Sequence, residues 1–304
     1  MEWAIRFEKV SKSFNSIRAL DEVSLAVHRG QVFGLIGPDG AGKTTAIRIM
    51  ATLLIPDAGR VSVLGFDVSL SPFEIKRRIG YMPQNFSLYR DLTVMENVEF
   101  YAGIYKVEKK VLKERIENLL DFTGLKPFID RVADALSGGM KQKLALACSL
   151  IHEPELVLLD EPTTGVDPVA RRQFWKILDG LVARGMSVLV STPYMDEAER
   201  CHRIAFINKG KIVREGMVDE LRTPDGWQLI VVSGPNVRKL ASVAKKIEGV
   251  ISAQPMGDSL RVQLKENVDL EKFKSCLPNN ENYRLEKLKP SLEDVFANIL
   301  SDTE

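Results

Sequence analysis

The sequence predicts an α/β fold in which a parallel sheet carries a phosphate-binding loop. Residues 156–160 and 187–192 are short, continuous apolar runs, typical of strands buried on both faces of a sheet. A third apolar run, residues 32–36, leads into a glycine-rich loop and then into a helical stretch at residues 46–50. Strands that alternate with helices in this way favour a parallel arrangement.

The glycine-rich loop matches the pattern GxxxxGK[ST]. Its glycines allow successive backbone N–H groups to turn around a polyphosphate, while the lysine reaches the terminal phosphates and the hydroxyl holds magnesium. The following helix favours phosphate at its N-terminus. A glycine-rich turn with a surface lysine is the alternative interpretation. The predicted nucleotide-binding residues are Gly37, Pro38, Asp39, Gly40, Ala41, Gly42, Lys43, Thr44 and Thr45.

Length and composition set the broad class of the protein. With 304 residues the chain is long enough for two domains. A formal net charge of +1 gives no electrostatic reason to expect a nucleic-acid partner. The three cysteines have no metal-ligand spacing, which indicates reduced thiols in a cytosolic protein. Since no run approaches the ~20 apolar residues of a membrane span, we expect membrane contact only through a partner.

Two half-exposed strands are predicted before the loop. Residues 4–10 and 22–28 alternate apolar and polar side chains, as strands with one buried face do. Phe14 lies between them, and from the residues alone it can equally be a loop aromatic that covers the core. A further short strand is expected over residues 60–65.

The middle of the chain predicts an inserted helical subdomain, over about residues 86–150. Residues 79–84 resemble a strand that ends at the polar Gln84. From residue 93 to residue 123, apolar side chains recur at helical spacing, and Gly124 is the expected stop.

A second potential anion site follows this block. Ser137 has the chemistry of a helix N-cap, and Gly138 and Gly139 leave the first amides of the helix over residues 143–151 bare. An ordinary capped helix is the alternative, and on this segment alone it is the better one.

Two carboxylates, Asp160 and Glu161, end the strand at residues 156–160. In proteins with a parallel sheet, ligands bind beyond the carboxyl ends of the strands. Both side chains should therefore lie beside the phosphate loop. Asp160 can then hold Mg²⁺ through water, and Glu161 can polarise an attacking water. The alternative, a merely charged strand end, is disfavoured by the loop. Asp167 is predicted to cap a helix that Pro168 opens.

The remaining elements complete the first domain and predict a second one. A helix at residues 195–202 and a hairpin of residues 203–208 and 211–215 precede an expected linker at residues 222–226. The order of elements beyond it suggests a small ferredoxin-like βαββαβ domain with an added helix, in a packing or regulatory role. Its expected strands are residues 227–233, 250–254, 259–265 and 283–288, and its helices are residues 237–248, 270–277 and 292–300.

Taken together, these motifs resemble an ABC-type ATPase over residues 1–220. The chain looks like the nucleotide-binding subunit of an ABC transporter, and residues 290–296 resemble the tail of such subunits in bacterial ABC-2-type exporters. The resemblance implies a P-loop NTPase (RecA-like) core with an antiparallel β subdomain and an inserted helical subdomain. The accessory domain predicted from the order of elements would follow it at residues 227–304. It rests on the order and spacing of the phosphate loop, Gln84, residues 136–142, residues 156–161 and Asp167.

The resemblance also implies roles for residues around one ATP. Lys43 would contact the β- and γ-phosphates, and Thr44 would bind Mg²⁺. Gln84 would sense the Mg²⁺ and the attacking water and link the site to a membrane subunit. Asp160 would be the Walker B aspartate that binds Mg²⁺, and Glu161 the catalytic base.

Other roles involve the adenine ring and a second protomer. Phe14 resembles the aromatic residue that stacks on adenine. Ser137, Gly138 and Gly139 would form the signature motif that caps the γ-phosphate of ATP held by the opposite protomer, and Asp167 would lie at that interface. The implied assembly is a homodimer or heterodimer of ATP-binding subunits with an integral membrane permease, cytoplasmic and peripheral on the inner face of the cell membrane.

One position departs from the family pattern. The family usually places a histidine that contacts the γ-phosphate directly after the strand at residues 187–192, whereas this chain has Pro193. Proline offers no side-chain donor and no backbone N–H. A proline simply accommodated at a strand end is compatible with the sequence, but it leaves the phosphate one contact short. We therefore expect ATP binding to survive and hydrolysis to be slowed.

Two other functions remain open at this stage. The first is an ABC-type ATPase that acts on DNA or ribosomes without a transporter, although the chain shows no coiled-coil or zinc insertion. The second is an ATP-binding regulator with little turnover, which Pro193 favours and Glu161 disfavours. The sequence does not identify a transported substrate.

Overall fold

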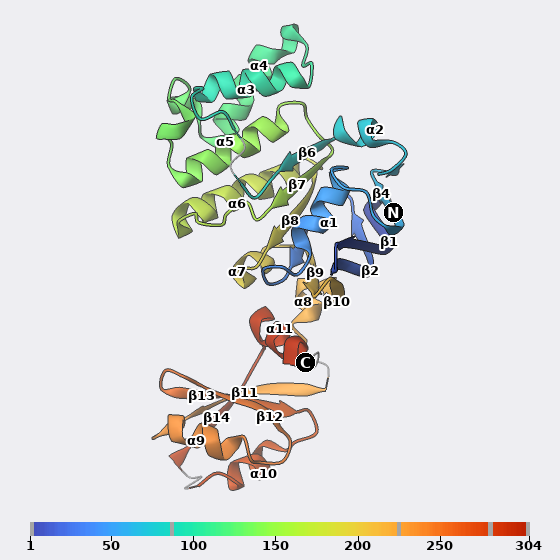
Figure 1. The fold of residues 1–304 in the computed structure, drawn as a ribbon. Helices are drawn as coiled ribbons and strands as arrows, with labels where there is room; N and C mark the ends of the chain where they lie inside the picture. The colour runs from blue at the N-terminus through green and yellow to red at the C-terminus, as the bar shows by residue number, and fades with distance from the viewer. Residues whose placement is uncertain (1–2, 86–87, 224–225, 279–281, 302–304) are drawn as a thin grey trace. The chain divides into compact units, whose positions relative to one another are not determined.

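The computed structural model describes residues 3–85, 88–223, 226–278 and 282–301. The chain divides into two compact units, Met1–Met217 and Val218–Glu304 (Figure 1). Residues 224 and 225, in the expected linker, lie outside the described residues. None of the described helices is long and apolar enough to cross a membrane.

The first unit is built on a six-stranded, mostly parallel sheet, which confirms the predicted α/β fold. The strands at its centre are buried along their whole length, as their continuous apolar sequences predict. Only the edge pair β9–β10 is antiparallel. In spatial order the strands are β10 (Lys211–Met217), β9 (Arg203–Asn208), β3 (Val32–Ile36), β8 (Ser187–Thr192), β7 (Leu156–Asp160) and β6 (Ile79–Met82).

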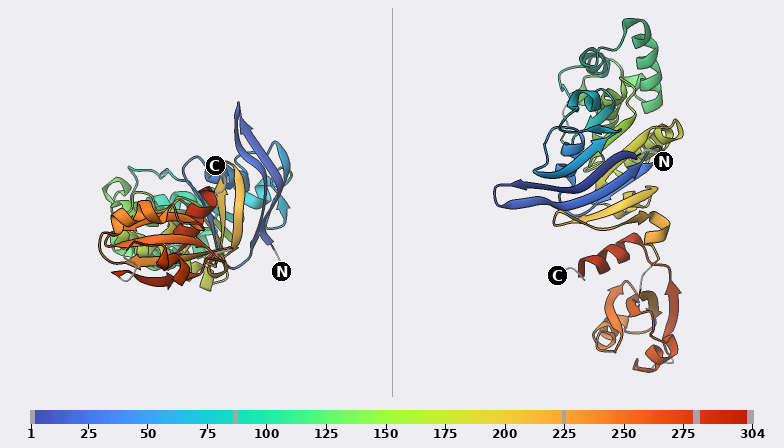
Figure 2. Two further views of the ribbon diagram at one scale, coloured as in Figure 1. Left: turned by 90° about the horizontal axis from the view of Figure 1, so that it is seen from below. Right: turned by 90° about the vertical axis from the view of Figure 1, so that its right-hand side faces the viewer.

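A second, antiparallel sheet has the order β2–β1–β4–β5. The predicted half-exposed strands are both present and longer than expected, with twelve residues each. Their pairing shifts register at several points, and two non-glycine residues, Lys9 and Glu22, have positive φ in these strands. The β1–β2 hairpin extends well beyond the rest of the sheet (Figure 2). The strands are β1 (Trp3–Phe14), β2 (Ile17–His28), β4 (Ala58–Val63) and β5 (Phe66–Asp67).

Helices cover both faces of the parallel sheet (Figure 1). On one face, α1 (Lys43–Met50) packs between β7 and the antiparallel sheet, and its apolar side chains join one hydrophobic core with both sheets. On the other face lie α5 (Gly138–Leu150), α6 (Pro168–Ala183) and α7 (Met195–Ala198). The short helix α2 (Pro72–Lys76) lies beside β5 and β6.

The helical stretch predicted from residue 93 to residue 123 is two helices, α3 (Val94–Ile104) and α4 (Lys109–Thr123). The chain turns between them at Lys106, whose φ is 55°. Thr93 and Glu96 form a capping box at the start of α3. Gly124 ends α4 in the left-handed conformation, as predicted. Two 3-10 turns, η1 (Lys126–Phe128) and η2 (Ala133–Ala135), lead from α4 to α5.

The second unit contains the predicted ferredoxin-like fold. Its antiparallel sheet has the order β12–β13–β11–β14, so the first and third strands of the βαββαβ unit lie at the centre. One face carries a core with α9 and α10, and Val295 of α11 packs on Trp227 and Leu229. The elements are α8 (Val218–Leu221), β11 (Trp227–Ser233), α9 (Val237–Ala244), β12 (Val250–Met256), β13 (Ser259–Lys265), α10 (Leu270–Ser275), β14 (Arg284–Leu288) and α11 (Leu292–Ser301).

Several helices have ends that differ from the prediction. The helix expected over residues 143–151 begins earlier, at Gly138, and others are shorter than expected. The helix expected over residues 195–202 ends at Ala198, and the one expected over residues 237–248 ends at Ala244. Helix ends depend on caps and tertiary contacts more than on apolar spacing, so pattern alone places them poorly.

Candidate active site

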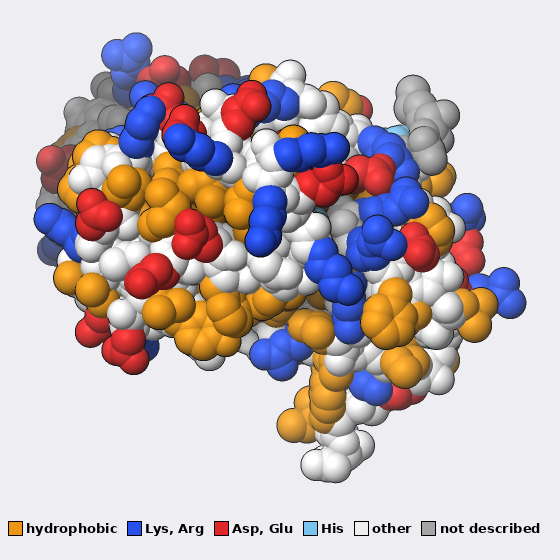
Figure 3. Space-filling model, turned by 90° about the horizontal axis from the view of Figure 1, so that it is seen from above, with side chains coloured by type: hydrophobic (Ala, Val, Ile, Leu, Met, Phe, Trp, Pro, Cys, Tyr) orange, Lys and Arg blue, Asp and Glu red, His pale blue; other side chains and the backbone are white. Residues whose placement is uncertain are grey.

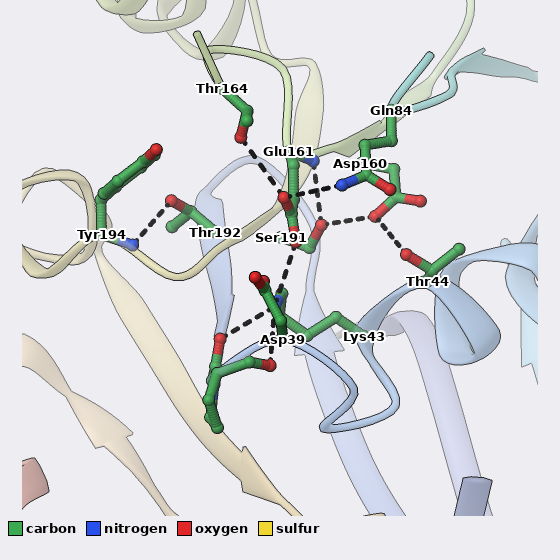
Figure 4. A network of polar contacts seen from close by, with 12 residues as sticks. Asp39, Lys43, Thr44, Gln84, Asp160, Glu161, Thr164, Ser191, Thr192 and Tyr194 are labelled. Carbon is green, nitrogen blue, oxygen red and sulfur yellow. Dashed lines mark hydrogen bonds and ion pairs between the residues drawn. The ribbon is translucent and has the colours of Figure 1, made fainter.

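The loop between β3 and α1 wraps around the amine of its own lysine. Nζ of Lys43 donates hydrogen bonds to the backbone oxygens of Gly37, at 2.8 Å, and of Pro38, at 3.0 Å (Figure 4). A Cβ at Gly37 would clash with the carbonyl oxygen of Ile207, and Gly42 has a φ of 109° at the N-cap of α1. Glycine is therefore required at both positions by the fold itself, before any ligand is considered.

Lys43 also pairs with the carboxylate that follows β7. Its Nζ lies 3.1 Å from Oε1 of Glu161, and the two side chains are 3% and 6% exposed. Oε2 of Glu161 accepts hydrogen bonds from Nε2 of Gln84, at 3.0 Å, and from Oγ1 of Thr164, at 3.3 Å. The structure thus brings three predicted site residues, Lys43, Gln84 and Glu161, into direct contact (Figure 4).

Asp160 is buried next to this pair and is only half satisfied. Its Oδ1 accepts hydrogen bonds from Oγ of Ser191, at 2.7 Å, and from Oγ1 of Thr44, at 3.1 Å. Its Oδ2 is buried and has no hydrogen-bond partner among the described residues. Burial raises the pKa of the Asp160 carboxyl, although the hydrogen bonds from Ser191 and Thr44 oppose that shift.

This arrangement fits a divalent cation. A hard cation such as Mg²⁺ takes oxygen ligands, and an unpartnered carboxylate oxygen beside a threonine hydroxyl offers them. A nearby positive charge would also offset the unfavourable burial of the Asp160 carboxylate. Among the residues that the structure describes, no group of three or more His, Cys, Asp and Glu side chains could hold a metal ion.

Strand register explains why these residues meet. In the parallel pairs, Asp160 lies opposite Ser191, and Ile36, which precedes the loop, lies opposite Thr192. The backbone N–H of Glu161 is 3.0 Å from Oγ of Ser191 and 3.1 Å from its carbonyl oxygen. This contact holds Glu161 at a φ of 49°, a left-handed conformation that is unusual for a glutamate.

A cavity of about 500 Å³ opens above the loop. It contains most of the predicted phosphate-binding residues together with Gln84 and Glu161, and it also includes four residues that the sequence did not indicate. These four come from the start of β2 and from the β9–β10 turn, which only the tertiary fold brings to the loop. The lining residues are Ile17, Arg18, Ala19, Asp39, Gly40, Gly42, Lys43, Thr44, Thr45, Gln84, Glu161 and Lys209.

Phe14 lies at the end of the β1–β2 hairpin and is 43% exposed. It pairs with Ile17 across the turn, and Nζ of Lys12 lies 5.8 Å from its ring centroid. Ile17, rather than Phe14, is among the residues that line the cavity. Stacking of Phe14 on a base therefore stays a prediction, and Ile17 is a second apolar side chain at the same end of the hairpin.

The second predicted anion site lies at the start of α5 and is not part of this cavity. Ser137 caps the helix as expected, and its Oγ accepts a hydrogen bond from the N–H of Met140 at 3.3 Å. A Cβ at Gly139 would clash with Cβ of Ala170 on α6, whereas a Cβ at Gly138 would meet no atom within 4 Å. Packing against α6 therefore explains the glycine at position 139, whereas no contact within the described chain explains the glycine at position 138.

Asp167 caps α6, as the sequence predicts. Its Oδ1 accepts hydrogen bonds from the N–H groups of Val169, at 3.0 Å, and Ala170, at 2.9 Å. These bonds fix the carboxylate at the helix start, and Asp167 does not line the cavity.

The segment after β8 is held without a side-chain donor at position 193. The N–H of Tyr194 donates to Oγ1 of Thr192 at 3.1 Å, and the guanidinium of Arg171 lies 4.4 Å from the Tyr194 ring centroid. In the following helix α7, the buried Glu197 accepts a hydrogen bond from Oγ1 of Thr163. Pro193 is therefore accommodated between well-anchored neighbours.

Comparison with known sequences gives consistent matches. The family described as "ABC transporter" matches residues 20–164, a range that includes the loop and both strand-end carboxylates. The chain is 40% identical over 284 residues to the probable multidrug ABC transporter ATP-binding protein YbhF of Escherichia coli K12, covering 93% of this chain and 49% of that protein. The chain therefore spans about half the length of this relative.

Other relatives are matched over most of their length. The Nod factor export ATP-binding protein I of Sinorhizobium fredii is 37% identical over 97% of this chain and 85% of its own length. The daunorubicin resistance ATP-binding protein DrrA2 of Streptomyces coeruleorubidus is 35% identical over 98% of this chain and 95% of its own length.

Solved structures match the first part of the chain. The ATP-binding cassette MJ0796, in a dimeric post-hydrolysis state bound to ADP and Pi, has a TM-score of 0.65 at 28% identity over 70% of this chain and 98% of that one. An ATP-binding subunit of an ABC transporter matches with a TM-score of 0.65 at 30% identity, over 72% of this chain and 92% of that one.

Proposed function

Because the chain belongs to the family of ABC transporter ATP-binding proteins, we propose that it binds and hydrolyses ATP and powers export through a separate membrane-spanning partner. The observation that carries this proposal is the buried cluster of Lys43, Thr44, Asp160 and Glu161. It lies at the carboxyl ends of the central strands of the parallel sheet. A lysine, a hydroxyl and two carboxylates at a glycine-rich loop are the groups that phosphoryl transfer from a nucleotide requires.

The phosphates of ATP would lie in the cavity above the loop. The backbone N–H groups of residues 39–45 and the dipole of α1 favour negative charge there. Lys43 would leave its contacts with the loop carbonyls and Glu161 to bind the β- and γ-phosphates. The adenine would lie at the start of β2, against Phe14 or against Ile17, which lines the cavity.

Thr44 and Asp160 would hold Mg²⁺ through the threonine hydroxyl and the unpartnered Oδ2. When bound there, the cation would neutralise negative charge that develops on the phosphates during transfer. Ser191 would keep Asp160 oriented, since its hydroxyl already donates to the other carboxylate oxygen.

Glu161 would accept a proton from the attacking water. A carboxylate needs to be ionised and within hydrogen-bond reach of that water to act as a base. Gln84 and Thr164 both donate hydrogen bonds to Oε2 of Glu161, so they orient its carboxylate. Once its hydrogen bond to Glu161 is broken, Gln84 would also bind the Mg²⁺ or the attacking water.

A second protomer would complete the site. Ser137, Gly138 and Gly139, at the start of α5, do not line the cavity of their own chain. The first amides of this helix would bind the γ-phosphate of ATP held by another chain. Asp167 would lie at the same interface. The dimeric MJ0796 cassette is consistent with such an assembly.

We propose that Pro193 slows the hydrolysis step. The backbone around it is held by Thr192 and Tyr194, but proline contributes no hydrogen-bond donor to a γ-phosphate. An ATP-binding regulator with little turnover is the second candidate function, and Pro193 is the observation that favours it.

The membrane partner would bind beside the Gln84 loop. Tyr89 and Phe100 are 49% and 39% exposed, and their ring centroids lie 4.5 Å apart. Buried Asn97 on α3 bonds to both the N–H and the carbonyl of Tyr89, so Tyr89 is tied to the helical subdomain. The Tyr89–Phe100 pair is therefore held in place for a partner to bind.

The face of the molecule in Figure 3 carries hydrophobic side chains between scattered basic and acidic ones. Binding to the membrane partner would place the chain on the inner face of the cell membrane.

Two measurements test the proposal. Purified chain should hydrolyse ATP in Mg²⁺ and lose that activity in EDTA, in Lys43→Ala and in Asp160→Asn, while Glu117→Gln, on an exposed face of α4, should match wild type. Co-purification with a polytopic membrane protein would support export. Failure to bind ATP at all would exclude the proposal, and ATP binding without measurable turnover in Pro193→His as well as wild type would favour the regulator.

A further inference from the structure

Asp39 is the single acidic residue among residues 37–45. Its side chain is 92% exposed, and its Oδ1 lies 3.9 Å from Nζ of Lys43. It accepts no hydrogen bond from any residue in the part of the chain that the structure describes. A negative charge therefore lies at the mouth of a loop whose amides and lysine favour a polyanion.

Asp39 and Glu161 share the same amine, but they differ in how they are held. Glu161 is 6% exposed and is also bound by Gln84 and Thr164. Asp39 has only its long contact to Lys43, and Figure 4 shows both carboxylates near the end of the lysine side chain. Glu161 has a use in the proposed reaction, whereas the Asp39 carboxylate has none.

We infer that the Asp39 carboxylate weakens binding of nucleoside triphosphates by competing with the terminal phosphate for Lys43. The inference rests on the proposed ATP site. The loop lysine is the group that reaches the β- and γ-phosphates. Asp39 lies on the same loop as Lys43, and its Oδ1 is 3.9 Å from the lysine amine. A terminal phosphate bound by Lys43 would therefore lie near the Asp39 carboxylate, and the two like charges would repel.

The consequence is selectivity that depends on phosphate number. ADP lacks the γ-phosphate, so its nearest negative charge lies farther from Asp39 and is repelled less. The side chain therefore lowers the preference of the site for ATP over ADP. The backbone N–H of Asp39 is unaffected and remains part of the phosphate loop.

The expected size of the effect follows from exposure. The interaction of two unit charges about 4 Å apart in water is worth about 1 kcal/mol, which changes a dissociation constant by about fivefold. Because Asp39 is almost fully exposed, the value for water applies rather than that for a buried pair. Dissolved salt screens such a pair over roughly 8–10 Å, so high salt should remove most of the effect.

The experiment compares wild type with Asp39→Asn in the full chain. Dissociation constants for ADP and for a non-hydrolysable imido analogue of ATP are measured calorimetrically with Mg²⁺, in low salt and in 0.5 M salt. Asp39→Asn should bind the triphosphate about fivefold more tightly in low salt and ADP less than twofold more tightly. The gain should largely vanish in high salt. Asp39→Ala should behave alike, because charge and not amide hydrogen bonding is the cause.

Three results would overturn the inference. Equal tightening for both nucleotides would mean that residue 39 acts through loop conformation. Unchanged or weaker triphosphate binding would mean that the carboxylate does not oppose the phosphate. Loss of nucleotide-dependent dimerisation with unchanged nucleotide affinity would mean that the Asp39 carboxylate contacts the partner protomer instead. If wild type itself binds no nucleotide, the proposed function fails instead, so the two failures are distinguishable.

Discussion

Nζ of Lys43 lies 3.1 Å from Oε1 of Glu161, and both side chains are almost completely buried. The proposed phosphate-binding lysine and the proposed base therefore neutralise each other in this structure. Binding of phosphate would separate them, which frees the carboxylate only when there is a substrate to act on.

The first prediction concerns Glu161→Gln. Removing the base should lower the ATP hydrolysis rate by about 10²- to 10⁴-fold. ATP affinity should stay equal to that of wild type or rise, because Lys43 no longer has to break an ion pair with residue 161 before it binds phosphate. Steady-state hydrolysis and equilibrium ATP binding measure the two effects, with Glu117→Gln as the charge-matched control. A loss of ATP affinity that parallels the loss of rate would contradict the assigned role.

The second prediction uses two adjacent glycines with different surroundings. A methyl group on Gly139 would collide with Ala170, so Gly139→Ala should lower the free energy of unfolding by about 1–3 kcal/mol. A methyl group on Gly138 meets nothing in its own chain, so Gly138→Ala should leave stability unchanged.

Gly138→Ala should nevertheless impair ATP-dependent dimerisation, if the start of α5 contacts ATP on a second protomer. Size-exclusion chromatography with and without ATP, alongside urea unfolding of both variants, separates the two effects. Normal dimerisation of Gly138→Ala would argue against the signature role of this helix start.

A third prediction concerns the missing donor at position 193. Pro193→His should raise the rate of ATP hydrolysis by about 10²- to 10³-fold, the usual value of one transition-state contact. ATP affinity should change little, because Thr192 and Tyr194 already hold the segment. Steady-state rates of the two proteins decide the matter, and equal rates would show that Pro193 does not limit turnover.

The fourth prediction concerns His152, which stacks on Tyr105 with ring centroids 3.6 Å apart and an interplanar angle of 7°. Its Nε2 lies 2.9 Å from the carbonyl oxygen of Ile79. The pKa of His152 is lowered to about 4, mainly by burial and to a smaller extent by the nearby Arg115, while the bond to Ile79 opposes the shift.

A lowered pKa means that the unfolded chain binds the proton more readily than the folded chain does. The stabilisation is fully present above pH 6.5 and is lost as the pH falls toward 4. The unfolding free energy should thus fall by up to about 1.4 kcal/mol per pH unit in this range. Urea unfolding from pH 7 to pH 4.5 should show a shallower fall in the free energy of unfolding for His152→Gln than for wild type, and equal slopes would contradict the prediction.

Much of the fold could be predicted because its signals are local. The buried strands β3, β7 and β8 have continuous apolar sequences, and the caps Ser137 and Asp167 have the side chains that helix starts favour. These features are set by a few neighbouring residues. They are therefore visible without tertiary information.

The site was predicted less completely because its missing members are distant in sequence. Ser191 binds both Asp160 and the backbone of Glu161, yet in the sequence it is one polar residue in an apolar strand. Ile17 and Lys209 reach the cavity only through strand pairing and a hairpin turn. No spacing rule along the chain connects such positions.

The backbone of Glu161 has a further consequence for how this chemistry can vary. Its φ is 49°, and its backbone N–H contacts Ser191 on the neighbouring strand. The sheet therefore helps to set the direction of the Cα–Cβ bond at position 161. Related chains could exchange the residue there, and so gain or lose hydrolysis, while the nucleotide-responsive architecture around it persists.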